Sequence, residues 1–141
     1  MATLFSRIIA GELPGTFVWR DEECVAFLSI NPLQPGHTLV VPRAEVDHWI
    51  DLPPDAVRHL VTVARTIGRG QQQAFDPARI GLLIAGMEVP HTHLHVIPIR
   101  SEADLHLSNA ARSVDPDELE RQAASLRAAL RDQGADGVAD A

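Results

Sequence analysis

The chain has 141 residues, a length that fits one compact domain and leaves no room for two. Its 12 cationic residues are all arginines, so no lysine is present for Schiff-base chemistry or for a phosphate-binding P-loop. A formal charge of −7 opposes binding to nucleic acid over most of the surface. Tyrosine is absent and Cys24 is the single cysteine, so acid–base chemistry near neutral pH depends mainly on seven histidines.

The N-terminal third predicts a short helix followed by three strands. We expect the helix to follow Thr3, whose hydroxyl suits an N-cap. Apolar runs then predict strands over residues 16–19, 24–30 and 37–41. Because these strands are close in sequence, they favour an antiparallel meander.

A second helix is predicted to begin near Pro53 and Pro54, because apolar residues follow at helical spacing. Gly68 and Gly70 are expected to weaken its end. Two further strands are predicted over 80–84 and 91–99.

The last helix is predicted to begin at Asp115, an N-cap followed by Pro116 at the first helical position. Beyond it, residues 134–141 are Gly-, Asp- and Ala-rich, and we expect them to form a disordered tail to a domain spanning 1–133. This order of elements predicts an α+β fold with helices packed on an antiparallel sheet.

The segment from His91 to Ile97 carries most information about function, because it places three histidines at alternate positions. On a strand, alternate side chains share one face and lie about 7 Å apart. We therefore expect His91, His93 and His95 to line one face and Leu94 to point toward a helix-covered core. Burying three polar rings costs free energy unless each finds a partner, so a purely structural role is disfavoured.

Two kinds of chemistry fit this row of imidazoles. In the first, the histidines bind a metal, and Glu88 or His37 completes the ligand set. In the second, a neutral imidazole attacks phosphorus, forms a phosphoryl-histidine and passes the group to water. The residues alone leave both alternatives open.

The same segment resembles the histidine triad (HIT) family, whose signature alternates histidines with apolar residues. His91 to Ile97 match it, with Thr92 at a position that is usually apolar. Residues 5–14, 25–32 and 35–43 are similar to the family's N-terminal segment and its next two strands. The resemblance covers residues 3 to about 130, and it is to the histidine triad nucleotide-binding (Hint-like) branch.

The resemblance implies a HIT-like fold with a five-stranded antiparallel sheet, which continues across a homodimer. It implies a nucleoside phosphoramidase or nucleotidyl hydrolase that attacks the α-phosphate of a purine nucleotide derivative through a covalent nucleotidyl-histidine. By position, His93 is the expected nucleophile, His95 contacts the phosphate, and His91 orients the nucleophile. His37 matches a fourth histidine of the pocket, and Ser29 and Ile30 match the segment that holds the nucleoside.

Many family members bind structural zinc through two cysteines and two histidines. Here Thr3 and Ser6 stand at the cysteine positions, with His48 and His91 at the others. Because hydroxyls are poor zinc ligands, we expect no structural zinc there and no cofactor.

Two further departures concern the substrate. Ser29 stands where an aspartate usually accepts hydrogen bonds from ribose, so a different nucleoside affinity or sugar selectivity is expected. Glu88 falls near the expected leaving group, where its charge would favour cationic or neutral amines over pyrophosphate.

The expected partners are purine nucleoside monophosphates or their derivatives and a second copy of the chain. No apolar run approaches the ~20 residues of a membrane helix, and the first residues lack a signal-peptide core, so a cytoplasmic protein is expected. The alternatives to a nucleotidyl hydrolase are a metal-dependent hydrolase and a non-catalytic nucleotide-binding dimer.

Overall fold

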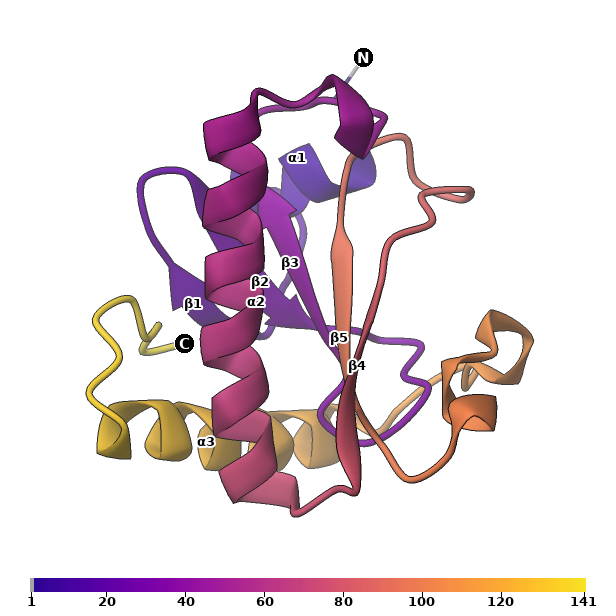
Figure 1. Ribbon diagram of the computed structural model, residues 1–141, viewed down its shortest axis with the longest axis vertical. Coiled ribbons are helices and arrows are strands. Elements are labelled where there is room, and N and C mark those ends of the chain that lie inside the picture. Colours follow the sequence, from indigo (N-terminus) through magenta and orange to yellow (C-terminus); the bar gives the residue numbers. More distant parts are fainter. Residues whose placement is uncertain (1) are drawn as a thin grey trace.

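The computed structural model describes residues 2–141; Met1, the first residue of the predicted domain, lies outside the described residues. Its centre is a five-stranded antiparallel sheet in the order β1-β2-β3-β5-β4 (Figure 1). The predicted antiparallel sheet is therefore confirmed. The strands are β1 (Phe17–Arg20), β2 (Cys24–Leu28), β3 (Thr38–Pro42), β4 (Arg79–Leu83) and β5 (Leu94–Ile99).

Helices cover the sheet unequally. The long α2 packs on β3, β4 and β5, and α3 packs on α2 and β1 (Figure 1). The short α1 begins at the predicted cap, where the Thr3 hydroxyl accepts a hydrogen bond from the Ser6 backbone N–H. The helices are α1 (Leu4–Ile9), α2 (Pro54–Phe75) and α3 (Pro116–Asp132), with 3₁₀ turns η1 (Trp49–Asp51), η2 (Glu102–Leu105) and η3 (Leu107–Asn109).

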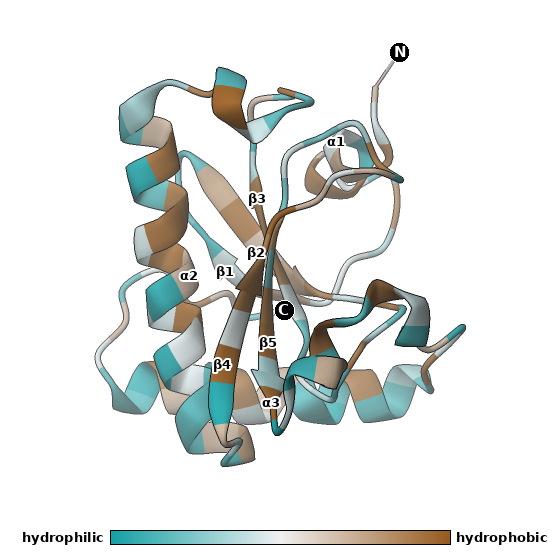
Figure 2. Cartoon of the chain, turned by 45° about the vertical axis from the view of Figure 1, so that its right-hand side comes forward, coloured by the Kyte–Doolittle hydropathy of each residue, from teal (hydrophilic) through white to brown (hydrophobic). Residues whose placement is uncertain are grey.

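Because successive side chains of a strand point to opposite faces of the sheet, the core is divided into two layers. In β2, Cys24, Ala26 and Leu28 pack in the cluster beneath α2 and α3. Val25 and Phe27 belong to a second cluster that contains Phe5 of α1. The central strands are accordingly coloured largely hydrophobic in Figure 2, whereas the outer side of α3 is largely hydrophilic.

The helix α2 does not weaken at its glycines, in contrast to the prediction. It continues through Gly68 and Gly70 to Phe75. A Cβ atom on Gly70 would lie 2.7 Å from a methyl carbon of Leu130, so this glycine allows α2 and α3 to pack closely. Tertiary packing therefore outweighs the low helix propensity of glycine here.

The C-terminal residues 134–141 are not a disordered tail in this structure. The backbone N–H of Arg20 donates to the Gly137 carbonyl at 2.9 Å, and Ala139 donates to Val18 at 3.0 Å. Val138 forms a bridge opposite Trp19, and the side chain of Ala139 is buried. The segment thus covers the free edge of β1, an edge that would otherwise expose unpaired backbone groups.

The strand β5 begins at Leu94 rather than at His91, three residues later than predicted. The cause is Thr92, whose backbone N–H and hydroxyl both donate to the Val46 carbonyl at 2.8 Å. These bonds hold His91 to His93 outside the regular pairing with β3. Across residues 2–141, no helix combines the length and the apolar character that a membrane span requires.

Candidate active site

A tight turn before β3 positions His37. Gly36 has φ +89°, and a Cβ atom there would lie 2.5 Å from the Phe75 ring. The Gly36 backbone N–H donates to the buried side-chain amide of Gln122, and its carbonyl accepts from Gln71 of α2. The turn is therefore held from both helices, and the next residue, His37, points its ring at the sheet face that carries the other histidines.

Three imidazole rings form a continuous row on this face, and Phe5 joins the ring of His91 to it. The ring centroids of His37 and His95 are 5.1 Å apart, and those of His95 and His93 are 5.0 Å apart. Phe5 of α1 packs edge-on against His93 at 4.9 Å and against His91 at 5.9 Å. The structure thus brings together all four histidines that the sequence singled out, and it adds Phe5.

A backbone carbonyl determines which nitrogen of His93 carries the proton. The Nδ1 atom of His93 lies 2.7 Å from the carbonyl oxygen of His91. Because a carbonyl only accepts, Nδ1 donates its hydrogen there. A neutral His93 therefore keeps its free electron pair on Nε2, the nitrogen available to attack an electrophile.

Two hydrogen bonds in sequence likewise determine which nitrogen carries the proton in His37 and in His95. The backbone N–H of Leu33 donates to Nδ1 of His37 at 3.0 Å, so the His37 proton resides on Nε2. That Nε2 atom lies 2.9 Å from Nδ1 of His95 and donates to it. A neutral His95 therefore carries its own proton on Nε2, where it can be donated to an anionic oxygen.

Burial favours the neutral form of these rings. It lowers the pKa of His37 to about 3, with further lowering from His95 and His93. Burial and the neighbouring His93 lower the pKa of His95 to about 4. The pKa of His93 is also lowered by burial, while its bond to the His91 carbonyl and the charge of Glu88 oppose that shift. At neutral pH all three are uncharged imidazoles.

His91 links this row to α1. Its Nε2 atom donates to the Pro42 carbonyl at 2.8 Å, and its Nδ1 atom lies 2.7 Å from the Thr3 hydroxyl. Glu45 accepts from the Thr3 backbone N–H and from the Ser6 hydroxyl, both at 2.7 Å. These bonds lower the pKa of the exposed Glu45 carboxyl. Together they tie α1 to the segment that carries the histidines.

The residues at the positions of the expected structural zinc site do not suit zinc. Thr3 and Ser6 offer hydroxyls, which are poor zinc ligands, and both hydroxyls are already engaged with His91 and Glu45. His91 also commits its second nitrogen to the Pro42 carbonyl. That the set holds no zinc stays a prediction, which these hydrogen bonds favour.

The remaining predicted site residues surround the row. Ser29 donates its backbone N–H to the His37 carbonyl at 2.9 Å, and its hydroxyl accepts from the Asn31 N–H, which leaves the hydroxyl hydrogen free for a ligand. Ile30 is exposed beside it. Glu88 is exposed, and its charge acts on His93.

A cavity of about 230 Å³ adjoins His93. It is lined by Thr92 and His93 together with residues 47–49 and 84–87. Trp49 is partly exposed on this cavity. The cavity gives a bound group access to His93.

Sequence reasoning missed the groups that orient the rings. The carbonyls of His91 and Pro42 and the N–H of Leu33 belong to the backbone, which every residue shares, so no side-chain pattern marks them. Phe5 could have been found, because it is an apolar residue in the first turn of the helix predicted after Thr3.

Comparisons with known proteins agree on one family. The HIT domain model matches residues 10–102. An uncharacterized HIT-like protein of Methanocaldococcus jannaschii is 35% identical over 121 residues, which are 82% of this chain and 94% of that protein. Adenylylsulfatase HINT3 of Arabidopsis thaliana is 29% identical over 133 residues, 91% of this chain and 67% of that protein.

A solved structure is similar over nearly the whole chain. The crystal structure of a Zn-bound histidine triad family protein from Mycobacterium smegmatis superposes with a TM-score of 0.81 at 30% sequence identity. The match covers 95% of this chain and 96% of that one.

The buried neutral histidines predict that acid destabilises the fold. The pKa of His37 is about 3 in the folded chain, against 6.5 for an ordinary histidine. Between these values the unfolded chain binds a proton that the folded chain does not, so the free energy of unfolding falls as pH falls. For His37 alone the loss from pH 8 to pH 5 is about 2 kcal/mol.

Urea unfolding of the unaltered chain and of His37→Asn at pH 8 and pH 5 measures this effect. The variant should lose about 2 kcal/mol less than the unaltered chain over that interval. His106→Asn, which alters an exposed histidine, should keep the original pH dependence. The same pH dependence in His37→Asn and the unaltered chain would contradict the prediction.

Proposed function

The chain belongs to the HIT family, and we propose that it is a nucleotidyl hydrolase or transferase acting on purine nucleotide derivatives, with phosphoramidates as the preferred class. The observation that carries this proposal is the bond from His93 Nδ1 to the His91 carbonyl at 2.7 Å. This bond leaves Nε2 of a neutral imidazole free, which is the state that nucleophilic attack on phosphorus requires.

In the proposed reaction, Nε2 of His93 attacks the α-phosphorus of a nucleoside phosphoramidate. A bond forms between Nε2 and phosphorus, the bond from phosphorus to the amine breaks, and the amine leaves after taking up a proton from solvent. Water then attacks the nucleotidyl-histidine and releases a proton to solvent, giving a nucleoside monophosphate and free His93. The N–H on Nε2 of His95 donates to a phosphoryl oxygen and stabilises the charge that develops there.

The nucleoside is proposed to lie near Ser29 and Ile30. The backbone bond from Ser29 to the His37 carbonyl keeps this segment beside the row of histidines. The Ser29 hydroxyl can donate one hydrogen bond to a sugar hydroxyl, whereas a carboxylate could accept two. The exposed Ile30 offers an apolar contact to a base.

We prefer the covalent mechanism to the metal-dependent one because most of the ring nitrogens that would bind a metal already make hydrogen bonds. His91 engages both of its nitrogens, and His37 does the same with Leu33 and His95. A ligand set built on these rings would have to break several buried hydrogen bonds, each costly to leave unmade.

We also propose that two copies pair through the face formed by α2 and β4. The strand β4 is an edge of the sheet, and a hollow of about 340 Å³ lies beside it between α2 and β4. Leu82 and Val61 line the hollow and are 50% and 42% exposed. A second copy would cover these apolar groups and extend the sheet to ten strands.

The covalent intermediate is tested by mixing the chain with an adenosine 5′-phosphoramidate. Mass spectrometry of the intact protein, quenched without acid, should show a nucleotidyl adduct, and AMP should be released. His93→Ala should lack the adduct and lose at least about 10³-fold in turnover, because no nucleophile remains. His95→Ala should slow turnover by about 10²-fold.

The control for this experiment is His106→Ala, which alters an exposed histidine outside the row and should keep full activity. An adduct on His93→Ala would refute the assignment of the nucleophile. Tight nucleotide binding without turnover in the unaltered chain would instead support a non-catalytic binding protein.

Glu88 is predicted to select the leaving group. Its negative charge near His93 should favour a departing amine over a departing pyrophosphate or sulfate. Glu88→Gln should reduce the ratio of kcat/KM for an adenosine phosphoramidate to that for a dinucleoside polyphosphate by about 2- to 5-fold, a size typical of an exposed charge. Glu102→Gln, an exposed carboxylate on η2, serves as the control. Faster cleavage of the polyphosphate by the unaltered chain would show the preference to be wrong.

The pairing face is tested with Leu82→Asp. Because Leu82 is half exposed in the single chain, the substitution should leave the domain folded and place a charge in the apolar contact. Light scattering after size-exclusion chromatography should show a dimer for the unaltered chain and a monomer for the variant. Leu107→Asp alters a leucine that is 44% exposed on η3 and should stay dimeric. A monomeric unaltered chain would end this proposal.

A further inference from the structure

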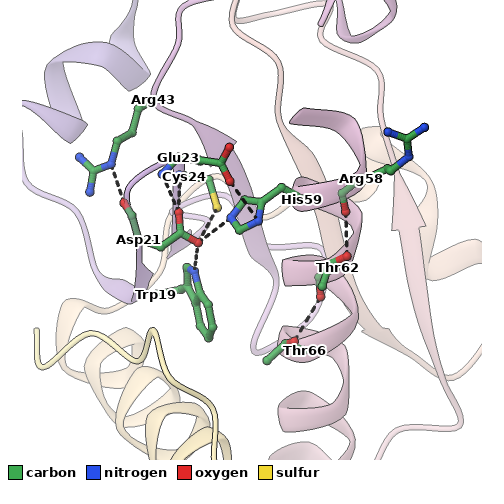
Figure 3. A network of polar contacts seen from close by, with 9 residues as sticks. All are labelled: Trp19, Asp21, Glu23, Cys24, Arg43, Arg58, His59, Thr62 and Thr66. Atoms are coloured by element: carbon green, nitrogen blue, oxygen red, sulfur yellow. Dashed lines mark hydrogen bonds and ion pairs between the residues drawn. The ribbon is translucent and has the colours of Figure 1, made fainter. Parts of the chain in front are cut away.

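Three potential metal ligands lie outside the candidate active site, where the turn between β1 and β2 meets α2 (Figure 3). They are Asp21, Cys24 and His59, and one ligand atom from each lies within 4.8 Å of the others. Within residues 2–141 no second group of three such side chains meets this spacing.

The carboxylate of Asp21 is the centre of this cluster. Its Oδ2 atom accepts from Nε2 of His59 at 2.7 Å and from the Cys24 thiol at 3.5 Å. Because the indole N–H of Trp19 also donates to Oδ2, three hydrogens converge on this one oxygen. In a tetrahedral zinc site with bonds of about 2.0–2.3 Å, neighbouring ligand atoms are about 3.3–3.8 Å apart. The sulfur-to-oxygen distance already falls in that interval, and the nitrogen needs to move by about half an ångström.

Neighbouring groups already hold the side chains of Asp21 and His59 in position. The other oxygen of Asp21 accepts the backbone N–H groups of Glu23 and Cys24 at 2.8 Å, and Trp19 Nε1 donates to Oδ2 at 2.8 Å. The Nδ1 atom of His59 lies 3.2 Å from the Glu23 carboxylate. Histidines that bind metals commonly donate the opposite ring N–H to a carboxylate, and Glu23 stands where that partner is needed.

We propose that Asp21, Cys24 and His59 form a metal site that takes Zn²⁺, with water as the fourth ligand. Sulfur, imidazole nitrogen and carboxylate oxygen together suit zinc better than magnesium or calcium. On binding, the thiol releases its proton to solvent. To bind the ion, His59 presents an Nε2 atom without hydrogen; the bound ring keeps one hydrogen on Nδ1, which faces the Glu23 carboxylate, and any second ring proton goes to solvent. One cation then replaces the thiol hydrogen and the imidazole hydrogen that now point at Oδ2 of Asp21.

The site is reachable and would act on stability. The side chains of His59 and Asp21 are 31% and 22% exposed, so an ion and its water can approach, while Cys24 is buried. A bound ion would join the β1–β2 turn to α2. Since the site does not exist in the unfolded chain, binding would raise the free energy of unfolding.

Cobalt provides a direct test, because Cys24 is the only cysteine in the chain. Any thiolate-to-cobalt charge-transfer absorption must therefore come from this residue. One equivalent of Co²⁺ should produce that near-ultraviolet band together with visible bands of four-coordinate cobalt. One equivalent of Zn²⁺ should then abolish both, and Zn²⁺ alone should raise the midpoint of thermal unfolding.

Variants separate this site from other histidines. Cys24→Ala should lose the band, His59→Gln should weaken Co²⁺ binding by at least about 10-fold, and Glu23→Gln by up to about 10-fold. His93→Ala and His106→Gln should keep the band unchanged, since neither residue belongs to the cluster. Because His59 is partly exposed, His59→Gln keeps the test valid even if Cys24→Ala does not fold.

Two results would overturn the proposal. One is the absence of a charge-transfer band at a several-fold excess of Co²⁺ over protein. The other is unchanged Co²⁺ affinity in His59→Gln, which would show that the imidazole takes no part.

Discussion

The geometry of the site depends on one constraint: the neutral rings of His37, His93 and His95 each have a single proton, and a fixed partner decides which nitrogen holds it. For His93 the partner is a carbonyl two residues earlier in the chain, and for His37 it is the N–H of Leu33. Burial keeps the rings neutral, so the constraint applies at physiological pH. The Gly36 turn and the Thr92 bonds matter because they hold those backbone partners in place.

The position of α1 rests on two contributions of different strength. Phe5 is 6% exposed and packs among the apolar residues of β2 and β3, a burial worth about 2–3 kcal/mol. The hydrogen bonds from Thr3 and Ser6 to Glu45 lie near the surface, where such bonds contribute less. The apolar contact therefore holds the helix, while the bond to His91 sets its register against the histidines.

Sequence patterns predicted what depends on local periodicity. The Thr3 and Asp115 caps and the burial of Leu94 beneath α2 followed from them. They could not predict features that arise where distant segments meet. The packing of Gly70 against Leu130, the pairing of residues 134–141 with β1, and the late start of β5 are of this kind. The partners of His59 were missed for the same reason, because Asp21 lies 38 positions away.

The alternation of side chains between the two faces of a strand also explains why one small sheet can carry two independent sites. Cys24 and Val25 are neighbours in β2, yet Cys24 packs beneath α2 and Val25 packs with Phe5. A ligand of the proposed zinc site thus points away from the face that holds His93, with a whole sheet between them. Because interior packing is dense, a change at one face reaches the other only through the backbone of the strand. Metal binding at Asp21, Cys24 and His59 would accordingly act on the stability of the sheet and leave the proton positions of the histidine row unaltered.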